Sequence, residues 1–260
     1  MKLGLKNKTA LVLGASRGLG AAIARGLAEE GVTVHAAARN TSAISAWASE
    51  LAPTAGPVIP LQLDLSDIDS VNKAVQSLLA DGGVDILVNN SGGPPPAAAI
   101  DAKRTDWLTH FETMAANIFH ITTSLLPGMR EKRWGRIISI ASSGVEQPIV
   151  RLALSNGIRS ALIGWSKTLA AEVAADGVTV NVILPGRIHT QRVDELDAAA
   201  ASRSAKSVEE IAAESAAGIP AGRYGRPEEF AAVAIFLASE PASYVTGSKI
   251  RVDGGAIRSV

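Results

Sequence analysis

The sequence of 260 residues contains no cysteine, which excludes disulfide bonds, thiol catalysis and zinc-thiolate sites. Aromatic residues make up only 4% of the chain, so Ala, Val, Leu and Ile must form most of the core. The formal net charge is zero and the Lys and Arg residues are scattered, which argues against nucleic acid as a partner. No apolar run approaches the ~18 residues of a membrane span. We therefore expect a cytoplasmic protein without a metal site or a membrane partner, which binds small molecules and copies of itself.

Short apolar runs alternate with helical patterns along the whole chain. Strands that are apolar throughout are buried on both faces, and their alternation with helices is typical of a doubly wound parallel sheet. The sequence therefore predicts one Rossmann-like α/β domain over residues 1–260, with ligands bound at the carboxyl ends of the strands. Strands are expected at residues 9–13, 32–38, 58–63, 85–88, 136–141, 178–184 and 249–252, and the longer helices at 67–79, 105–126, 154–175 and 227–238.

The segment TALVLGASRGLG, residues 9–20, organises the rest of the chain. An apolar run ends in glycines spaced GxxxGxG, at Gly14, Gly18 and Gly20. A pyrophosphate must approach bare backbone at such a turn, because a Cβ would clash and because φ can be positive there. The N–H groups that open the following helix then face the anion. The segment predicts a nucleotide site, although three glycines can also serve tight packing alone.

Residues 188–220 differ from the rest, because they are Ala-rich and charged and contain no predicted strand. They follow the sixth strand at its carboxyl end, which is where lids over substrate sites are attached. We interpret them as a helical lid within the single domain. The alternative is a peripheral pair of helices.

Six motifs in this order resemble the short-chain dehydrogenase/reductase family, and most closely its 3-oxoacyl-acyl-carrier-protein reductases. They are GASRGLG (14–20), DL (64–65), NNSG (89–92), GRIISIAS ending at Ser142, VTVNVILPGRIHT (178–190) and YVTGSKIRVDGG (244–255). The resemblance implies a nicotinamide coenzyme, with Asp64 at the adenine amine and Asn90 along the adenosine ribose. Residues 185–190 would then contact the nicotinamide amide. The full set of expected coenzyme residues is Gly14, Ser16, Arg17, Gly18, Leu19, Gly20, Arg39, Asp64, Leu65, Asn90, Pro185, Gly186, Ile188 and Thr190.

The end of the second strand favours NADP(H) over NAD(H). A carboxylate there would bind both ribose hydroxyls and repel a 2′-phosphate, but this chain has Ala38 at that position. Arg39 follows directly, and Arg17 lies in the glycine turn, so two guanidinium groups can flank a phosphate. Each arginine alone could equally be a solvated surface charge.

The catalytic residues implied by the resemblance are only partly present. Ser142 and Asn117 match the family's serine and asparagine, but Ser155 replaces the tyrosine and Arg159 the lysine. The pKa of a serine hydroxyl is near that of water and ~5 to 6 units above that of a tyrosine phenol. Loss of the proton is therefore ~7 to 8 kcal/mol less favourable for the serine. Ser155 therefore cannot simply replace the tyrosine as a general acid.

Three hypotheses follow. In the first, the chain reduces a carbonyl compound, such as an acyl thioester: Ser142 and Ser155 donate to the carbonyl oxygen, Arg159 stabilises the alkoxide, and a water chain beginning near Asn117 supplies the proton. His189 is another candidate acid. In the second, the chain binds NADP(H) without turnover, as a pseudoenzyme or redox-sensing module. In the third, a different enzyme uses Arg159 to hold an anionic substrate. The C-terminal helix and tail resemble the family's tetramer interface, so a homotetramer or a dimer is expected.

Overall fold

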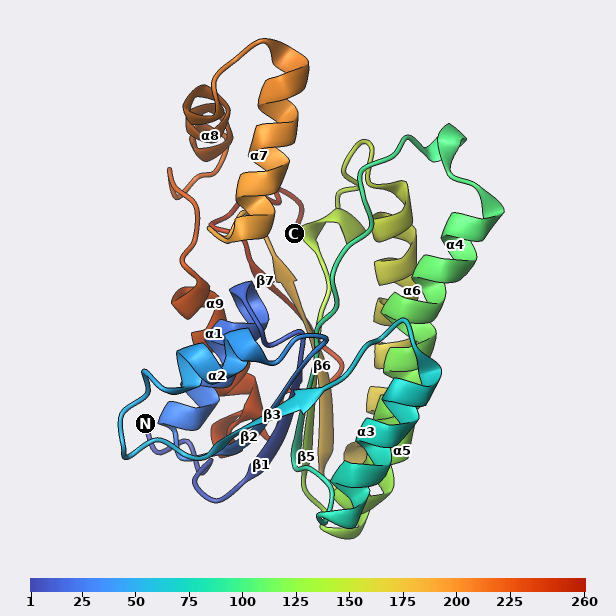
Figure 1. Ribbon diagram of the computed structural model, residues 1–260, viewed down its shortest axis with the longest axis vertical. Coiled ribbons are helices and arrows are strands. Elements are labelled where there is room, and N and C mark those ends of the chain that lie inside the picture. The colour runs from blue at the N-terminus through green and yellow to red at the C-terminus, as the bar shows by residue number, and fades with distance from the viewer.

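A seven-stranded, entirely parallel sheet forms the centre of the computed structural model, which describes all 260 residues (Figure 1). The strand order is β3-β2-β1-β4-β5-β6-β7, so the direction of winding reverses between β1 and β4. Each predicted strand is present, and its ends agree with the prediction to within one residue. The strands are β1 (Thr9–Leu13), β2 (Thr33–Ala38), β3 (Val58–Gln62), β4 (Ile86–Asn89), β5 (Gly135–Ile140), β6 (Val178–Pro185) and β7 (Lys249–Val252).

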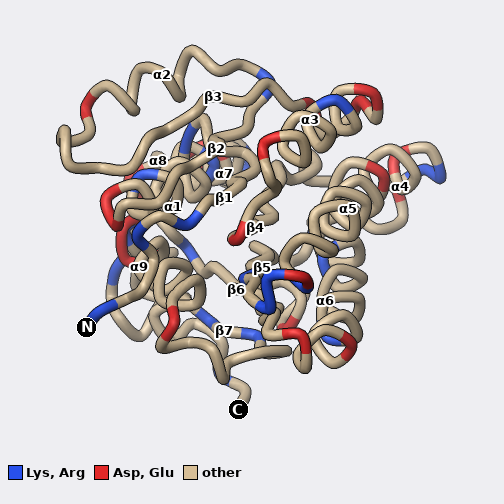
Figure 2. The backbone as a smooth tube through the Cα atoms, turned by 90° about the horizontal axis from the view of Figure 1, so that it is seen from below, with Lys and Arg blue, Asp and Glu red and all other residues tan.

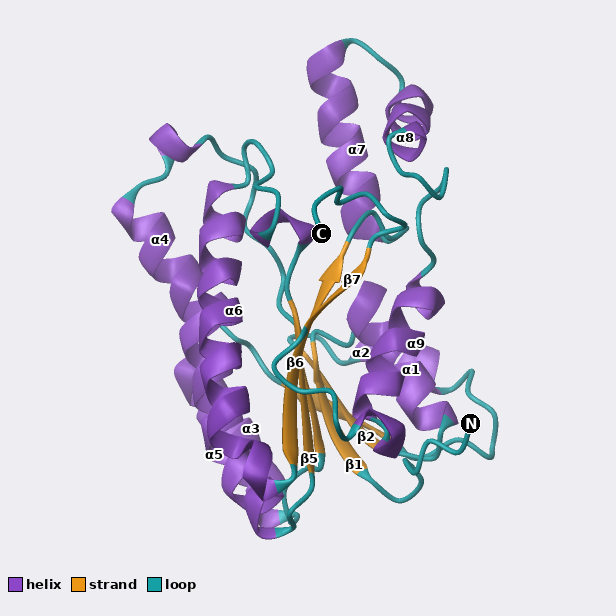
Figure 3. Cartoon of the chain, turned by 180° about the vertical axis from the view of Figure 1, so that it is seen from behind, coloured by secondary structure: helices purple, strands orange, loops and turns teal.

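Helices cover both faces of the sheet, as Figure 1 and the view from behind in Figure 3 show. One core cluster joins the sheet to the helices α1 and α9, and a second joins it to α3, α5 and α6. Branched and small aliphatic side chains fill both, as the scarcity of aromatic residues requires. The helices are α1 (Gly18–Glu29), α2 (Ser42–Ala48), α3 (Ile68–Ala80), α4 (Arg104–Phe111), α5 (Asn117–Glu131), α6 (Ala153–Val173), α7 (Gln191–Ser204), α8 (Val208–Ala217) and α9 (Pro227–Ala238).

The predicted helix at 105–126 is divided in the structure. A π-helical turn, Glu112–Ala116, separates α4 from α5, and Asn117 is the first residue of α5. The helix also continues beyond the predicted end, because Pro127 is exposed and the backbone group that it leaves without a partner can be hydrated. No helix is long and apolar enough to cross a membrane. In Figure 2 the positions of Lys and Arg are interspersed with those of Asp and Glu along the backbone.

The helices α7 and α8 extend beyond the carboxyl edge of the sheet, at the top of Figure 1. Asp197, buried on α7, forms an ion pair with Arg187 and accepts a hydrogen bond from the Tyr224 hydroxyl at 2.8 Å. These contacts fix the middle of α7 to the segments on either side of it. Residues 188–220 therefore form two helices attached at the edge where the predicted site lies.

Candidate active site

The glycine turn after β1 exposes main chain. Gly14 and Gly18 have φ values of +64° and +60°, which side chains rarely adopt. A Cβ on Gly20 would lie 2.2 Å from the Gly14 carbonyl oxygen, so the start of α1 packs directly against the turn. The amide nitrogen of Asn90 donates to the Leu13 carbonyl at 3.2 Å. This cradle fits the pyrophosphate of a dinucleotide, which binds backbone N–H groups at a helix N-terminus.

A tryptophan supports the turn from outside. The buried Trp47 of α2 donates from Nε1 to the Ala15 carbonyl at 3.1 Å, and the Ala15 N–H donates to the Ala37 carbonyl at 2.9 Å. The turn is therefore fixed to β2 and α2 as well as to Asn90. Sequence reasoning missed this role of Trp47. The signal was a single large aromatic residue in a helix of only seven residues.

The two predicted phosphate-binding arginines belong to different segments, Arg39 directly after β2 and Arg17 directly before α1. Ala38 ends that strand, and Arg39 is exposed. Arg17, the residue before α1, contacts Gln191 and lies 3.8 Å from Glu195, both in the first turns of α7. The last residue of β2 is an alanine and not the carboxylate that would repel a 2′-phosphate, which fits NADP(H).

Asp64 lies in the segment between β3 and α3, and Asn117 is bonded to the same segment. Oδ1 of Asp64 accepts from the Ser66 N–H at 2.9 Å and from the Ser66 hydroxyl at 2.7 Å. These two bonds lower the pKa of Asp64, and the bond from the Ser66 backbone has the larger effect. The positive charge of Arg39 lowers this pKa further. Asn117, buried, donates from Nδ2 to the Leu65 carbonyl at 2.9 Å. Its amide nitrogen is thus occupied, while its oxygen accepts no hydrogen bond within the chain.

Ser142 follows β5, and Ser155 and Arg159 lie one turn apart on α6. The Ser142 hydroxyl oxygen accepts from the Gly144 N–H at 3.1 Å, which leaves its proton free to be donated elsewhere. Ser155 is half-buried. Arg159 Nη1 donates to the Ile140 carbonyl at 2.8 Å, at the end of β5. The i, i+4 spacing puts the serine and the arginine on one face of α6.

Arg159 also reaches the loop after β4. Its Nη2 donates to the Ser91 carbonyl at 3.4 Å. The pKa of Arg159 is lowered to about 10, mainly because the side chain is buried and also because Arg192 carries the same charge. The side chain is still protonated at neutral pH, so it supplies a fixed positive charge and cannot relay a proton.

Residues 185–190 run beside the glycine turn. The Gly186 N–H donates to the Val252 carbonyl at 2.9 Å, and a Cβ there would lie 2.6 Å from the Asp253 Cα. Ile188 is buried, and the methyl group of Thr190 would lie 3.7 Å from a Cβ on Gly18. In the segment that the resemblance assigns to the nicotinamide amide, Thr190 therefore borders the glycine turn, whereas Gly186 lies against the end of β7.

The alternative proton donors lie elsewhere. His189 is exposed, and its Nε2 lies 3.3 Å from the Asp194 carboxylate. Tyr224 is bonded to Asp197, and burial raises the pKa of its phenol, which makes it a weaker acid. Tyr244 is fully exposed, and Lys167 donates to the Gly247 carbonyl at 3.0 Å. None of these side chains takes the place of the tyrosine or the lysine.

Comparison with known proteins gives the class. Residues 14–256 match the family profile described as enoyl-(acyl carrier protein) reductase. The chain belongs to the short-chain dehydrogenase/reductase family of NAD(P)-dependent oxidoreductases. The 3-oxoacyl-(acyl-carrier-protein) reductase FabG of Vibrio cholerae is 36% identical to it over 253 residues, 97% of this chain and 98% of that protein.

Two solved structures are similar over nearly the full length. L-sorbose reductase from Gluconobacter frateurii, complexed with NADPH and L-sorbose, has a TM-score of 0.94 and 32% identity and covers 100% of both chains. YwfH, an NADPH-dependent reductase involved in bacilysin biosynthesis, has a TM-score of 0.91 and 31% identity, over 98% of this chain and 100% of that one. The Rossmann-like fold predicted from the sequence is confirmed.

Proposed function

We propose that the chain is an NADP(H)-dependent reductase of carbonyl compounds. The cradle of Gly14, Gly18 and Gly20 and the absence of a carboxylate at Ala38 support this coenzyme. Of the two similar solved structures, YwfH is an NADPH-dependent reductase and L-sorbose reductase is complexed with NADPH. Arg17 and Arg39 are the expected ligands of the 2′-phosphate, and Asp64 of the adenine amine.

The observation that carries the proposal is the position of Arg159. Its guanidinium is held by the carbonyls of Ile140 and Ser91, at the ends of β5 and β4, on the same helix face as Ser155. A fixed positive charge there stabilises negative charge that develops on a carbonyl oxygen. Only two of its five N–H groups are used by the protein, so donors remain for the substrate.

When bound, NADPH supplies the hydride. In the proposed mechanism, Ser142 and Ser155 donate hydrogen bonds to the substrate carbonyl oxygen and orient it. Arg159 stabilises the alkoxide as the carbonyl carbon becomes tetrahedral. Water held at the free oxygen of Asn117 then delivers the proton, because neither a serine nor an arginine is acidic enough to do so near neutral pH.

Helices α7 and α8, in residues 188–220, are proposed to be the substrate lid. They stand over the carboxyl edge, and α7 contacts the glycine turn through Arg17. Closing a lid over the site would exclude water from the alkoxide.

The first substrate to test is a 3-oxoacyl thioester, because the similar curated proteins include 3-oxoacyl-(acyl-carrier-protein) reductases. We expect NADPH oxidation, followed at its absorbance, with the N-acetylcysteamine thioester of acetoacetate or with a simpler ketone. The Ser142→Ala variant should lose most of this activity. Absence of NADPH binding, measured by nicotinamide fluorescence, would contradict the whole proposal.

A second candidate function is coenzyme binding without turnover. It is favoured by one observation: the positions where the family has its tyrosine and lysine hold Ser155 and Arg159, and neither donates a proton at neutral pH. The double variant Ser155→Tyr plus Arg159→Lys separates the two functions. Activity in the double variant together with none in the parent supports the binding module, whereas activity in the parent supports the reductase.

We also propose a cytoplasmic homo-oligomer, either a tetramer or a dimer. Tyr244 is fully exposed and Phe236 of α9 is partly exposed, which is unusual for aromatic residues in a chain with so few of them. They lie in the C-terminal region that resembles the family's tetramer interface. Sedimentation of the parent and of Tyr244→Glu tests this: the parent should be an oligomer, and the variant smaller.

A further inference from the structure

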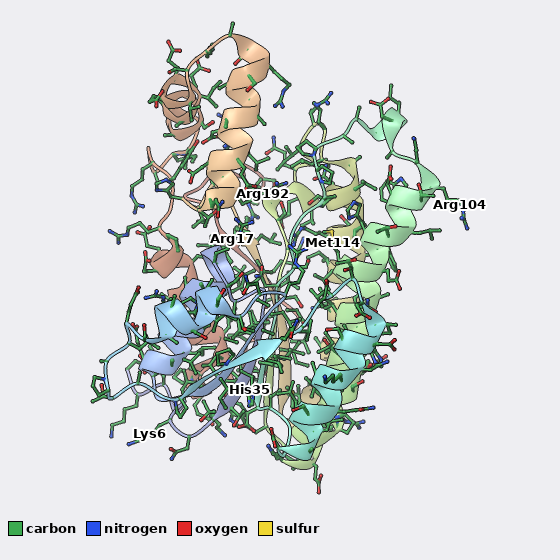
Figure 4. The ribbon with its side chains drawn as sticks, in the orientation of Figure 1. Lys6, Arg17, His35, Arg104, Met114 and Arg192 are labelled. Carbon is green, nitrogen blue, oxygen red and sulfur yellow. The ribbon has the colours of Figure 1, made fainter.

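Two arginines from separate helices reach the same short loop. Arg159 of α6 donates to the carbonyl of Ser91, and Arg192 of α7 donates from Nη2 to the carbonyl of Pro94 at 3.1 Å. These acceptors are three residues apart in the loop after β4. Figure 4 labels Arg192 at the base of α7, above the carboxyl edge of the sheet. The two guanidinium groups therefore flank one loop at the reacting end of the proposed site.

This pair of positive charges has little compensation within the chain. Both hydrogen bonds of Arg159 go to neutral carbonyls, and the charge that acts on it most is that of Arg192. The ion pair of Arg192 with Glu195, at 3.5 Å and one turn away on α7, is nearly half exposed and therefore weak. Glu195 also lies near Arg17. Partly buried like charges are costly unless an anion joins them.

Because Ser155 stands where the family has a tyrosine, the site lacks a phenol that could ionise and supply the negative charge. A tyrosine beside a cation can ionise to a phenolate, but the aliphatic hydroxyl of Ser155 cannot. The substitutions at 155 and 159 thus change the site together. They exchange an ionisable acid and a point charge for a neutral hydroxyl and a planar guanidinium, which suits bidentate binding of a carboxylate.

The anion is not the coenzyme's pyrophosphate. The phosphate cradle follows β1, whereas Arg159 is bonded at the end of β5, which is two strands further along the sheet. At ~4.8 Å per strand the two sites are about 10 Å apart. The anion is also not the phosphate of a long carrier arm, because Arg159 lies within one helical turn of Ser155, where the reacting carbonyl binds.

We infer that Arg159 and Arg192 bind a carboxylate of the substrate itself, so that the preferred substrate is a 2-oxo or 3-oxo carboxylic acid. The inference rests on the proposed reductase function. The two electrons and the hydrogen of the hydride add to the carbonyl carbon, the oxygen takes one proton from water, and the products are a hydroxy acid and NADP⁺. Arg159 uses its free N–H groups for both the carboxylate and the adjacent alkoxide, and Arg192 closes over the carboxylate from α7.

The kinetic test compares three derivatives of one acyl group: acetoacetate, methyl acetoacetate and the N-acetylcysteamine thioester. We expect kcat/KM with NADPH to be at least about tenfold higher for acetoacetate than for the neutral ester. In Arg192→Gln the ratio of acid to ester should fall towards one. Arg203→Gln, an exposed arginine at the other end of α7, should keep the parent ratio. Equal or faster turnover of the ester or the thioester in the parent would overturn the inference and leave the reductase intact.

A binding measurement decides the inference if no compound is turned over. Malonate, which has no reducible carbonyl, is titrated calorimetrically into the parent, Arg192→Gln and Arg203→Gln, each with and without NADP⁺. Saturable binding in the parent and Arg203→Gln that weakens at least about tenfold in Arg192→Gln supports the carboxylate site, whatever the outcome for reduction. No binding, or equal binding in all three proteins, overturns it. Failure of coenzyme binding is read separately, from the fluorescence of NADPH.

Discussion

Asn90 lies so close to Gly14 that a Cβ on Gly14 would come within 2.7 Å of the Asn90 side-chain nitrogen. The same nitrogen donates to the Leu13 carbonyl. The resemblance assigned Asn90 to the adenosine ribose, and the structure shows its amide nitrogen holding the glycine turn. The turn and the loop after β4 are therefore coupled, so that a change at one moves the other.

A first prediction concerns that contact. Gly14→Ala should lower both the free energy of unfolding and the affinity for NADPH, because φ is +64° and the added methyl group displaces Asn90. The backbone strain alone costs ~1 to 2 kcal/mol. Urea unfolding and NADPH fluorescence titration measure the two effects. The control is Gly164→Ala on exposed α6 surface, where nothing lies within 4 Å of a Cβ; it should be stabilising by ~0.5 to 1 kcal/mol. A Gly14→Ala variant with the parent's free energy of unfolding and NADPH affinity would contradict the prediction.

A second prediction concerns coenzyme choice. Arg17→Gln should weaken NADPH binding by about tenfold or more and change NADH binding little, because only the former carries the 2′-phosphate. Fluorescence titration with both coenzymes gives the ratio. Arg130→Gln, which removes a surface ion pair with Asp176 far from the turn, is the matched control. Equal loss of both affinities would indicate that Arg17 only holds α7 through Gln191 and Glu195.

A third prediction concerns the hydroxyl after β5. Ser142→Ala should lower kcat by about 10² to 10³, as expected for loss of one donor to a developing oxyanion. Its neighbour Ser143 provides the control, since Ser143→Ala keeps the loop and removes a hydroxyl that follows the reacting position. Steady-state NADPH oxidation by both variants is the measurement. Similar rates for the two would remove Ser142 from the mechanism.

A fourth prediction concerns pH. Burial lowers the pKa of His35 on β2 below 6.5, and the charge of Asp81 only partly offsets this. The unfolded chain then binds a proton that the folded chain resists, so the free energy of unfolding falls as pH drops from the unfolded pKa, ~6.5, towards the folded value. Urea unfolding at about pH 7.5 and about pH 5 should show this fall. The fall should be smaller in His35→Gln, and an identical slope in that variant would refute the assignment.

The fold was predictable because its signals are local and repeated. Val-rich and Ile-rich runs such as 178–184 mark buried parallel strands, and the glycine spacing of 14–20 marks the crossover at β1. The break at Glu112–Ala116 was not predictable, because a π-helical turn depends on how α4 and α5 pack and has no strong sequence signal. The same holds for the continuation through Pro127.

The candidate site was predictable only where a motif was involved. The resemblance to the family's catalytic motif pointed to Ser142, Ser155 and Arg159, and in the structure Ser142 follows β5 and Arg159 is bonded to its end. Arg192 and Trp47 were not found, because each acts on a backbone carbonyl of a segment distant in sequence, Pro94 and Ala15. Only the tertiary structure brings such pairs together.

The packing of α6 has a consequence for how this enzyme family diversifies. Leu154, Ile158 and Leu162 are buried and anchor the helix, while Ser155 and Arg159 lie on the neighbouring face, where Arg159 is bonded to the end of β5. Exchange of Ser155 and Arg159 therefore changes the site and leaves the three anchoring side chains in place. A helix whose anchoring side chains are separate from its reacting ones can carry different chemistry in different proteins of one fold.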